Sequence, residues 1–406
     1  MLNRQLYLRI WKELSTEKSM VFLAGPRQAG KTTLSGIIAE SFPNNLYFNW
    51  DIHSDRSLLY EDQHFFEKVE RRDSSIPLIV FDEIHKYENW KNYLKGVYDR
   101  FHNSYKFLVT GSGRLDIYQK GGDSLAGRYY MFHLFPFTMA ELGEKNILMP
   151  HFLRDPLQIN MERTAELKEI WSNLAELSGF PEPYLSGREQ TYRRWSGTYS
   201  HQLIREDIRD VVEIKSVTDV ETLYLLLPSK VGSPLSVSSL AGDLGVSYNS
   251  VRSWLTVFER FFLVFSISTW TEKISRAILK ERKYYLWDYP RIKDPAARFE
   301  NMVAAELWRA VTLWTDLGYG DFAIHFVKNK EKQEVDFLIV RDREPFLLIE
   351  AKLNDQEPSK SLLSFQKRLN VPAIQLNHGG DTYRLLTNDG NKILIAPAYH
   401  WLAQLP

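Results

Sequence analysis

The sequence contains no cysteine among its 406 residues. Disulfides, thiolate nucleophiles, cysteine-ligated zinc and iron–sulfur clusters are therefore excluded. It also lacks an excess of charge of either sign, because 51 basic residues balance 51 acidic ones. That balance argues against attachment to nucleic acid through bulk charge alone. Long hydrophobic runs are missing as well, since the most apolar stretches, 261–267 and 346–349, are far shorter than a membrane span.

The amino-terminal segment, MLNRQLYLRIWKEL, does not have the pattern of a secretory signal. We therefore expect a cytoplasmic protein that makes no contact with a membrane. Hydrophobic residues make up 44% of the chain and aromatic residues 14%, which is enough for ordinary folded cores. The length corresponds to about two or three domains.

Four stretches of the chain differ in pattern. Residues 1–145 alternate helical segments with short apolar runs, which are 20–25, 45–50, 77–82, 106–111 and 128–135. This alternation predicts an α/β domain with a parallel sheet covered on both faces. Residues 146–230 predict a helical connector, 231–290 a helix–turn–helix followed by two strands, and 291–406 a second α/β domain.

The strongest motif is GPRQAGKT, which matches G-x-x-x-x-G-K-[ST] between a predicted strand and a predicted helix. Its glycines let the loop bend so that backbone N–H groups point at phosphate oxygens. Lys31 is expected to reach the β- and γ-phosphates, and the Thr32 hydroxyl to ligate Mg²⁺. A chance glycine-rich turn is the alternative. The expected nucleotide-binding residues here are Gly25, Pro26, Arg27, Gln28, Ala29, Gly30, Lys31, Thr32 and Thr33.

Two acids, Asp82 and Glu83, end the third apolar run. In P-loop ATPases the first acid holds Mg²⁺ and the second can polarise the attacking water as a general base. Adjacent acids at a strand end also occur as a helix-capping pair. The next run ends in TGSGR, so we expect Thr110 and Ser112 at the same edge of the sheet. There they would either contact the γ-phosphate or cap a turn.

Four segments together resemble one family. GPRQAGKT, LIVFDEIHK, LVTGSGR and SLAGRYYMFHLFPFTMAEL resemble, in order and spacing, the AAA+-like P-loop ATPases of bacteria and archaea that carry a C-terminal domain of unknown function. The resemblance continues through GFPEPYL and Arg205–Asp207 and covers nearly all of the chain. It implies an ATPase that uses ATP and Mg²⁺. Where the family has serines after TGS, this chain has Gly113 and Arg114, which weakens the role given to Ser112.

Arg128, in the SLAGR segment, follows the TGS strand and stands at the very start of the fifth apolar run. Such a guanidinium can stabilise charge on the γ-phosphate, either in its own chain or from a neighbouring copy in a homo-oligomer. It can equally form a structural ion pair with a carboxylate. Arg27 is a second candidate for the catalytic arginine.

Residues 236–264 predict two helices joined by a tight turn, in which Gly245 ends the first helix and Ser247 caps the second. The two strands that follow would make this a winged helix, whose second helix enters the major groove in DNA-binding proteins. Seven basic and five acidic residues between 231 and 290 leave a net charge of only +2. DNA binding and protein docking therefore both stay open for this element.

The C-terminal part carries a second set of acids. Asp336 lies on one predicted strand, and Glu350 and Lys352 lie two residues apart on one face of the next. This is the set that a Mg²⁺-dependent phosphodiesterase uses, with the two carboxylates on the metal and the lysine helping to activate water. The order helix, three strands, helix, strand resembles the restriction-endonuclease-like fold, and Glu300 matches its helical acid. A surface salt-bridge ladder and an inactive nuclease fold are the alternatives.

These patterns leave three hypotheses. The first is a Mg²⁺-dependent AAA+-like ATPase that acts on or near nucleic acid, with Lys31, Asp82, Glu83 and Arg128 at its site. The second is an ATP-regulated, metal-dependent DNA nuclease that uses Asp336, Glu350 and Lys352. The third is a non-catalytic, nucleotide-gated module that binds DNA or protein.

Overall fold

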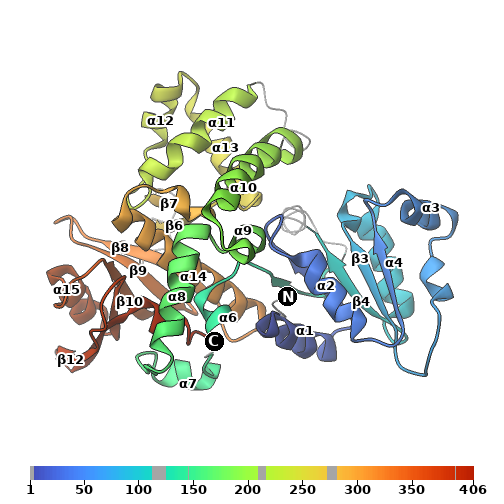
Figure 1. Cartoon of the computed structure of the whole chain (residues 1–406), viewed down its shortest axis with the longest axis horizontal. Helices are drawn as coiled ribbons and strands as arrows, with labels where there is room; N and C mark the ends of the chain where they lie inside the picture. The colour runs from blue at the N-terminus through green and yellow to red at the C-terminus, as the bar shows by residue number, and fades with distance from the viewer. Residues whose placement is uncertain (1–3, 112–124, 145, 209–215, 272–280, 389) are drawn as a thin grey trace. The chain divides into compact units, whose positions relative to one another are not determined.

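The computed structural model describes residues 4–111, 125–144, 146–208, 216–271, 281–388 and 390–406 (Figure 1). The chain divides into two units, one made of 1–136 with 260–262 and the other of 137–259 with 263–406. Within the described ranges, no helix combines the length and the hydropathy that crossing a membrane requires.

The first unit alternates strands and helices as the sequence predicts. Its strands are β1 (Met20–Ala24), β2 (Asn45–Asn49), β3 (Leu78–Asp82), β4 (Lys106–Thr110) and β5 (Tyr130–His133). Its helices are α1 (Gln5–Glu17), α2 (Lys31–Glu40), α3 (His53–Glu61) and α4 (Trp90–Phe101). All five apolar runs become strands, and their ends differ from the predicted ones by no more than about two residues.

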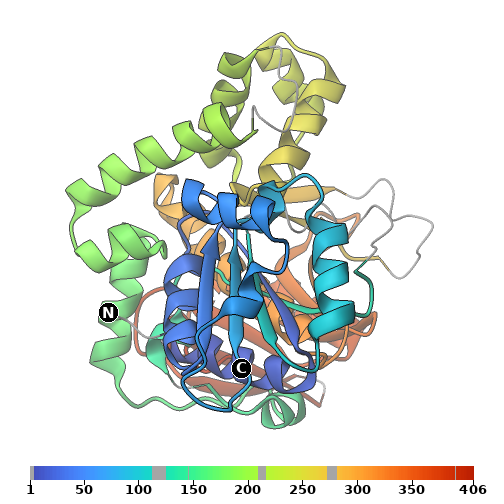
Figure 2. The ribbon, with the colours of Figure 1, turned by 90° about the vertical axis from the view of Figure 1, so that its right-hand side faces the viewer.

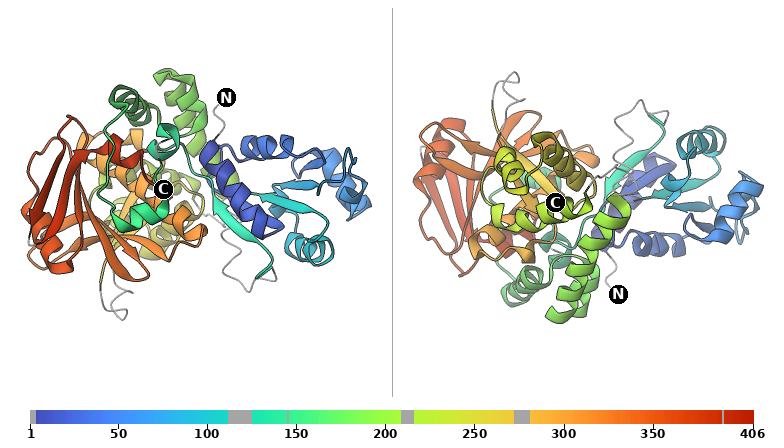
Figure 3. Two further views of the ribbon diagram at one scale, coloured as in Figure 1. Left: turned by 90° about the horizontal axis from the view of Figure 1, so that it is seen from below. Right: turned by 90° about the horizontal axis from the view of Figure 1, so that it is seen from above.

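The strands form a parallel sheet in the order β2-β3-β4-β1-β5. β1 and β3 are buried along their whole length, as expected for a sheet covered on both faces. Figures 2 and 3 show helices on both of its sides. Because all strands run in one direction, their carboxyl ends share one edge, where the P-loop follows β1 and Asp82 ends β3.

Aromatic rings fill one face of this sheet. Phe81, Phe107 and Phe22 come from the neighbouring strands β3, β4 and β1, and they belong to one buried cluster with Trp90 and Leu94 of α4. The rings of Phe81 and Phe107 stack with centroids 6.2 Å apart, and those of Phe22 and Trp90 lie 6.3 Å apart. This packing fixes α4 against the sheet and so positions the segment between β3 and α4, which carries Glu83.

The second unit begins with a series of helices. They are α6 (Met139–Gly143), α7 (Met149–Arg154), α8 (Thr164–Leu177), α9 (Pro181–Ser186), α10 (Glu189–Gln202) and α11 (Val217–Leu226). Helices therefore dominate the described part of the predicted connector.

The predicted helix–turn–helix is present as α12 (Val237–Leu244) and α13 (Tyr248–Arg260). Gly245 follows α12 with φ 66°, in the left-handed region where glycine carries no steric cost. The Ser247 hydroxyl accepts a hydrogen bond from the Ser250 N–H at 3.1 Å, as an N-cap does. Both predicted end signals are thus confirmed. The strands β6 (Val264–Thr269) and β7 (Arg282–Leu286) follow as an antiparallel pair.

The C-terminal part contains α14 (Pro295–Asp316), β8 (Phe322–Lys328), β9 (Glu334–Arg341), β10 (Glu344–Lys352), α15 (Lys360–Leu369) and β11 (Ala373–Asn377). This is the predicted order of helix, three strands, helix and strand. Beyond it lie β12 (Arg384–Asn388), β13 (Asn391–Pro397) and α16 (Ala398–Leu402), which the sequence did not predict.

These strands and the β6–β7 pair form a mixed sheet in the order β12-β13-β11-β10-β9-β8-β6-β7. β8, β9 and β10 are antiparallel neighbours, whereas β6 joins β8 in parallel at Ser268 and Thr269. The hairpin after the two helices is therefore continuous with the C-terminal sheet, across the predicted boundary at residue 290. The predicted α/β class, with an N-terminal parallel sheet, a helical region and a C-terminal α/β part, is confirmed.

α14 is the long helix that packs against this sheet. The Asp294 carboxylate accepts the Ala297 N–H at 2.7 Å, and Pro295 takes the first helical position, which is a favoured way to start a helix. More than half of the helix is buried. Because it packs on β7, β8, β9 and β10, its first turns bring Glu300 over the strands that carry the predicted acids.

Candidate functional site

The P-loop connects β1 to α2 at the carboxyl edge of the parallel sheet. Gly25 has φ 143°, and a Cβ at this position would lie 2.1 Å from the carbonyl oxygen of Leu134. Only glycine is compatible with that approach. Gly30 has φ 94° and precedes the first residue of α2. The two glycines of the motif therefore occupy backbone conformations that other residues rarely adopt.

Lys31 is buried at the start of α2 and folds back on the loop that precedes it. Its Nζ donates to the carbonyl oxygens of Gly25, at 3.0 Å, and Pro26, at 2.6 Å. A second cation, Arg4, donates to the carbonyl oxygen of Ala29 at 2.5 Å. Sequence reasoning missed Arg4, because no pattern connects it with a motif so far along the chain.

Of the other predicted nucleotide-binding residues, Arg27, Gln28, Thr32 and Thr33 are exposed and accessible to a ligand, whereas Pro26 and Ala29 are buried in the loop. Ser112 lies outside the described residues.

Asp82 is the centre of a hydroxyl network at the same edge. The residue is 1% exposed, and its Oδ2 accepts hydrogen bonds from Thr32 Oγ1 at 3.0 Å and from the Tyr47 hydroxyl at 2.8 Å. The hydroxyl of Thr110 donates to Oδ1. Hydroxyl and carboxylate oxygens are ligands that Mg²⁺ prefers, so Thr32 and Asp82 fit the ion that the motif predicts. Tyr47 was not predicted, because only the order of the strands brings β2 beside β3.

Glu83, the second acid, has a backbone φ of 56°, a left-handed conformation that is uncommon outside glycine. Its carboxylate lies 3.3 Å from Lys86 Nζ and 3.6 Å from His85 Nε2. Burial raises the pKa of Glu83, and the positive charges of Lys86 and Lys31 oppose this shift. Strained, partly desolvated acids of this kind are common at functional sites.

Arg128 lies at the other edge of the sheet. The β1–β5 register pairs Val21 with Tyr130, so the residues just before Tyr130 lie beside the amino end of β1, away from the P-loop. The Arg128 guanidinium donates to both carboxylate oxygens of Asp99 on α4, at 2.7 and 3.2 Å. The structure thus has the ion pair that the sequence left open. An in-chain role of Arg128 at the γ-phosphate is not compatible with this register.

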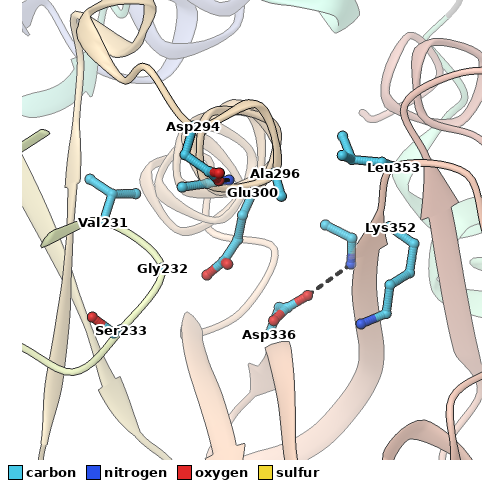
Figure 4. Close-up of a pocket in the computed structure, with 11 residues that line it drawn as sticks. Val231, Gly232, Ser233, Asp294, Ala296, Glu300, Asp336, Lys352 and Leu353 are labelled. Carbon is cyan, nitrogen blue, oxygen red and sulfur yellow. Dashed lines mark hydrogen bonds between the residues drawn. The ribbon is translucent and has the colours of Figure 1, made fainter. Parts of the chain in front are cut away.

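Two of the acids predicted in the C-terminal part line a cavity of about 410 Å³. Asp336 of β9, Lys352 of β10 and Glu300 of α14 line it, together with residues 231–233 (Figure 4). Figure 4 shows both carboxylates projecting into the cavity, from the helix and from the strand. The Ala351 N–H donates to Asp336 Oδ2 at 2.9 Å.

Glu350 is buried beside this cavity and has two donors. Lys352 Nζ lies 3.1 Å from its Oε1, and the Ser359 hydroxyl donates to Oε2 at 2.7 Å. The pKa of Asp336 is raised to about 7. Burial is the larger cause, and the negative charge of Glu300 is the second. The structure therefore brings the three predicted residues together. Over the described ranges, however, no group of three or more His, Asp or Glu side chains is arranged to hold a metal ion.

Two residues of β7 extend this cluster beyond the prediction. Lys283 Nζ lies 3.1 Å from Glu300 and 2.6 Å from Glu334. The Tyr285 hydroxyl donates to Glu300 at 2.8 Å. Sequence reasoning assigned these residues to a separate winged helix, and only the pairing of β6 with β8 brings them to the acids.

Three family models match successive parts of the chain. The model of an AAA domain matches residues 17–143. Residues 17–143 are an AAA domain. Two models of domains of unknown function match further along the chain, one (DUF8612) at residues 168–289 and one (DUF4143) at residues 296–399. The resemblance to AAA+-like P-loop ATPases with a C-terminal domain of unknown function is therefore confirmed.

Three relatives are named only as uncharacterized proteins. An uncharacterized protein of Methanocaldococcus jannaschii is 21% identical over 93% of this chain and 86% of its own length. Uncharacterized proteins of Mycobacterium bovis and Mycobacterium tuberculosis are each 23% identical over 66% of this chain. The chain spans about half the length of the two mycobacterial relatives, 54% in each case.

Two solved structures that resemble the chain are a Walker-type ATPase of Pyrococcus abyssi and the Orc1 protein of Aeropyrum pernix in complex with DNA. The first is 15% identical, with a TM-score of 0.46 over 72% of this chain and 95% of its own. The second is 14% identical, with a TM-score of 0.35 over 75% of this chain and 93% of its own.

Proposed function

We propose that the AAA domain binds ATP with Mg²⁺ and hydrolyses it at the carboxyl edge of its parallel sheet. The observation that supports this most is the 3.0 Å hydrogen bond between Thr32 and Asp82. It joins the hydroxyl of the P-loop to the first acid of β3, about fifty residues away in the sequence. If the glycine-rich turn had a purely structural role, a hydrogen bond between its threonine and this acid would not be expected.

In this proposal the phosphates lie against the backbone N–H groups of the P-loop and the start of α2. Lys31 exchanges its two loop carbonyls for oxygens of the β- and γ-phosphates. Glu83 accepts the proton of the attacking water, and its raised pKa makes the carboxylate a stronger base than an exposed glutamate. Mg²⁺ bound to Thr32 and Asp82 would neutralise charge on the phosphates.

The Mg²⁺ dependence of ATP affinity tests the role of Asp82. We expect the parent protein to bind ATP more tightly with Mg²⁺ than with EDTA, and Asp82→Asn to remove that difference, a loss of roughly 10- to 100-fold. Isothermal titration calorimetry measures both affinities. Asp62→Asn is the matched control, because Asp62 forms an exposed ion pair with Lys68 on the same domain. An unchanged Mg²⁺ effect in Asp82→Asn protein rules out this site for the metal.

A role of Arg128 at the γ-phosphate would require a second copy of the chain, since its own P-loop lies at the opposite edge. We propose a homo-oligomer for this reason alone, because in it Arg128 of one copy could reach the γ-phosphate bound by another copy. Sedimentation velocity with and without ATP provides the test, and a monomer under both conditions excludes the role in trans.

A second candidate function is metal-dependent cleavage of DNA by the C-terminal part. Its support is that Asp336 and Lys352 line one cavity, while the Glu350 carboxylate lies 3.1 Å from Lys352 Nζ. Exposed side chains on α13, namely Tyr248, Asn249, Arg252 and Ser253, provide a surface that a DNA groove could contact. Plasmid DNA tests both parts of this candidate. Salt-sensitive retention by the protein tests binding, and nicking that requires Mg²⁺ and is lost in Asp336→Asn tests cleavage.

A further inference from the structure

Lys283 is a buried cation among the acids of the C-terminal cluster. Its side chain is 1% exposed. Its Nζ lies 2.6 Å from Glu334, 3.1 Å from Glu300 and 4.0 Å from Asp336. Two elements thus direct three carboxylates at one ammonium group, because Glu334 and Asp336 share a face of β9 and Glu300 lies on α14 above them.

The carboxylates of the cluster already have donors from the protein. Glu300 accepts from the Tyr285 hydroxyl and pairs with Lys283. Asp336 accepts a backbone N–H and faces Lys283. Glu350 accepts from a hydroxyl and pairs with Lys352. A metal ion would need these oxygens as ligands and would lie close to a positive charge.

We propose that Lys283 is the built-in counter-ion of this pocket, so that the pocket binds a divalent cation only weakly while the Lys283 ammonium is in place. A doubly charged ion a few ångströms from an ammonium group is repelled even in water, and more strongly at a buried site. Removing the ammonium leaves the acids without their main partner. The pocket then becomes a divalent-cation site formed by Glu300 and Asp336.

This inference deepens the second candidate function, because it assigns the control of that pocket to Lys283. It is independent of ATP hydrolysis, which uses other residues. A divalent ion is therefore expected to bind the pocket of the parent protein only weakly. The cleavage activity is therefore expected to be suppressed in the conformation described, even though the acids that cleavage requires are assembled.

The test is a Mn²⁺ titration of the full chain, followed by water-proton relaxation. Lys31→Ala is the common background, so that the nucleotide site contributes equally to every sample. We expect Lys283→Ala to bind one Mn²⁺ at least about tenfold more tightly than the background protein, a gain equivalent to about 1.4 kcal/mol. Adding Asp336→Asn should abolish the gain.

Lys328→Ala is the matched control. Lys328 lies on β8 of the same sheet and pairs with one acid, Glu281, at 2.9 Å, so its loss should not change Mn²⁺ binding. Lys283→Met replaces Lys283→Ala if the alanine protein does not fold. A Lys283 variant that titrates like the background overturns the proposal. So does a background protein that already binds a tight Mn²⁺ equivalent which Asp336→Asn removes, a comparison that needs no change at Lys283.

Nicking of plasmid DNA separates this proposal from the second candidate function. Mg²⁺-dependent nicking by the unaltered protein without ATP supports the nuclease and overturns the role of Lys283. A gain of Mn²⁺ binding in Lys283→Ala without nicking by any variant supports the role of Lys283 and rejects the nuclease.

Discussion

Glu83→Gln protein is expected to bind ATP as tightly as the parent and to hydrolyse it about 100- to 10,000-fold more slowly. The amide keeps the size of the carboxylate, but it cannot accept a proton from the attacking water. The loss should therefore fall on the turnover number and leave the affinity for ATP unchanged. Steady-state phosphate release and titration calorimetry measure the two quantities separately.

The pH dependence of turnover gives a second readout for Glu83. Burial raises the pKa of this carboxyl above the ordinary glutamate value of 4.5. A general base must be deprotonated, so turnover by the parent should rise with pH through this raised pKa. Glu83→Gln protein should lack that acidic limb. Glu88→Gln, which changes an exposed acid of the same segment, serves as the control. Normal phosphate release by Glu83→Gln protein would reject the general-base role.

Lys31→Ala is expected to weaken ATP binding by roughly 100- to 10,000-fold. The Lys31 ammonium would contact two phosphates, and a hydrogen bond to a charged group contributes about 1.5–3 kcal/mol, so two contacts correspond to a factor of that size. We expect the variant to fold as the parent does, because Lys31 Nζ donates to carbonyl oxygens of its own loop, those of Gly25 and Pro26.

Calorimetric titration with ATP and Mg²⁺ measures this loss. Lys12→Ala, which removes an exposed lysine of α1, is the control for the change in overall charge. If Lys31→Ala binds ATP as well as Lys12→Ala does, the P-loop is not the nucleotide site.

The fold of the first unit could be predicted because the sequence signals for its strands and its P-loop lie within short segments. Five short apolar runs became five parallel strands, and β1 and β3 are buried along their whole length, as expected inside a sheet covered on both faces. The parallel arrangement then places the ends of β1 and β3 at one edge, and with them the P-loop and Asp82. The motif residues and their meeting point were therefore predictable together.

What the sequence did not predict depends on pairings between distant segments. Tyr47 reaches Asp82 through the order of two strands, and Arg4 reaches the P-loop from the segment that begins α1. Lys283 joins the C-terminal acids only because β6 pairs with β8 across a predicted boundary. Arg128 is the opposite case. Its place before β5 suggested a catalytic role, but the register of β5 with β1 puts it at the amino ends of the strands, away from the P-loop.

Steady-state phosphate release from ATP tests the central claim most directly. The full chain should release phosphate at a rate that saturates with ATP, requires Mg²⁺ and falls to the blank level in Lys31→Ala. Parent protein that binds ATP in calorimetry, yet releases no phosphate above the blank with excess Mg²⁺, would contradict ATP hydrolysis at the P-loop.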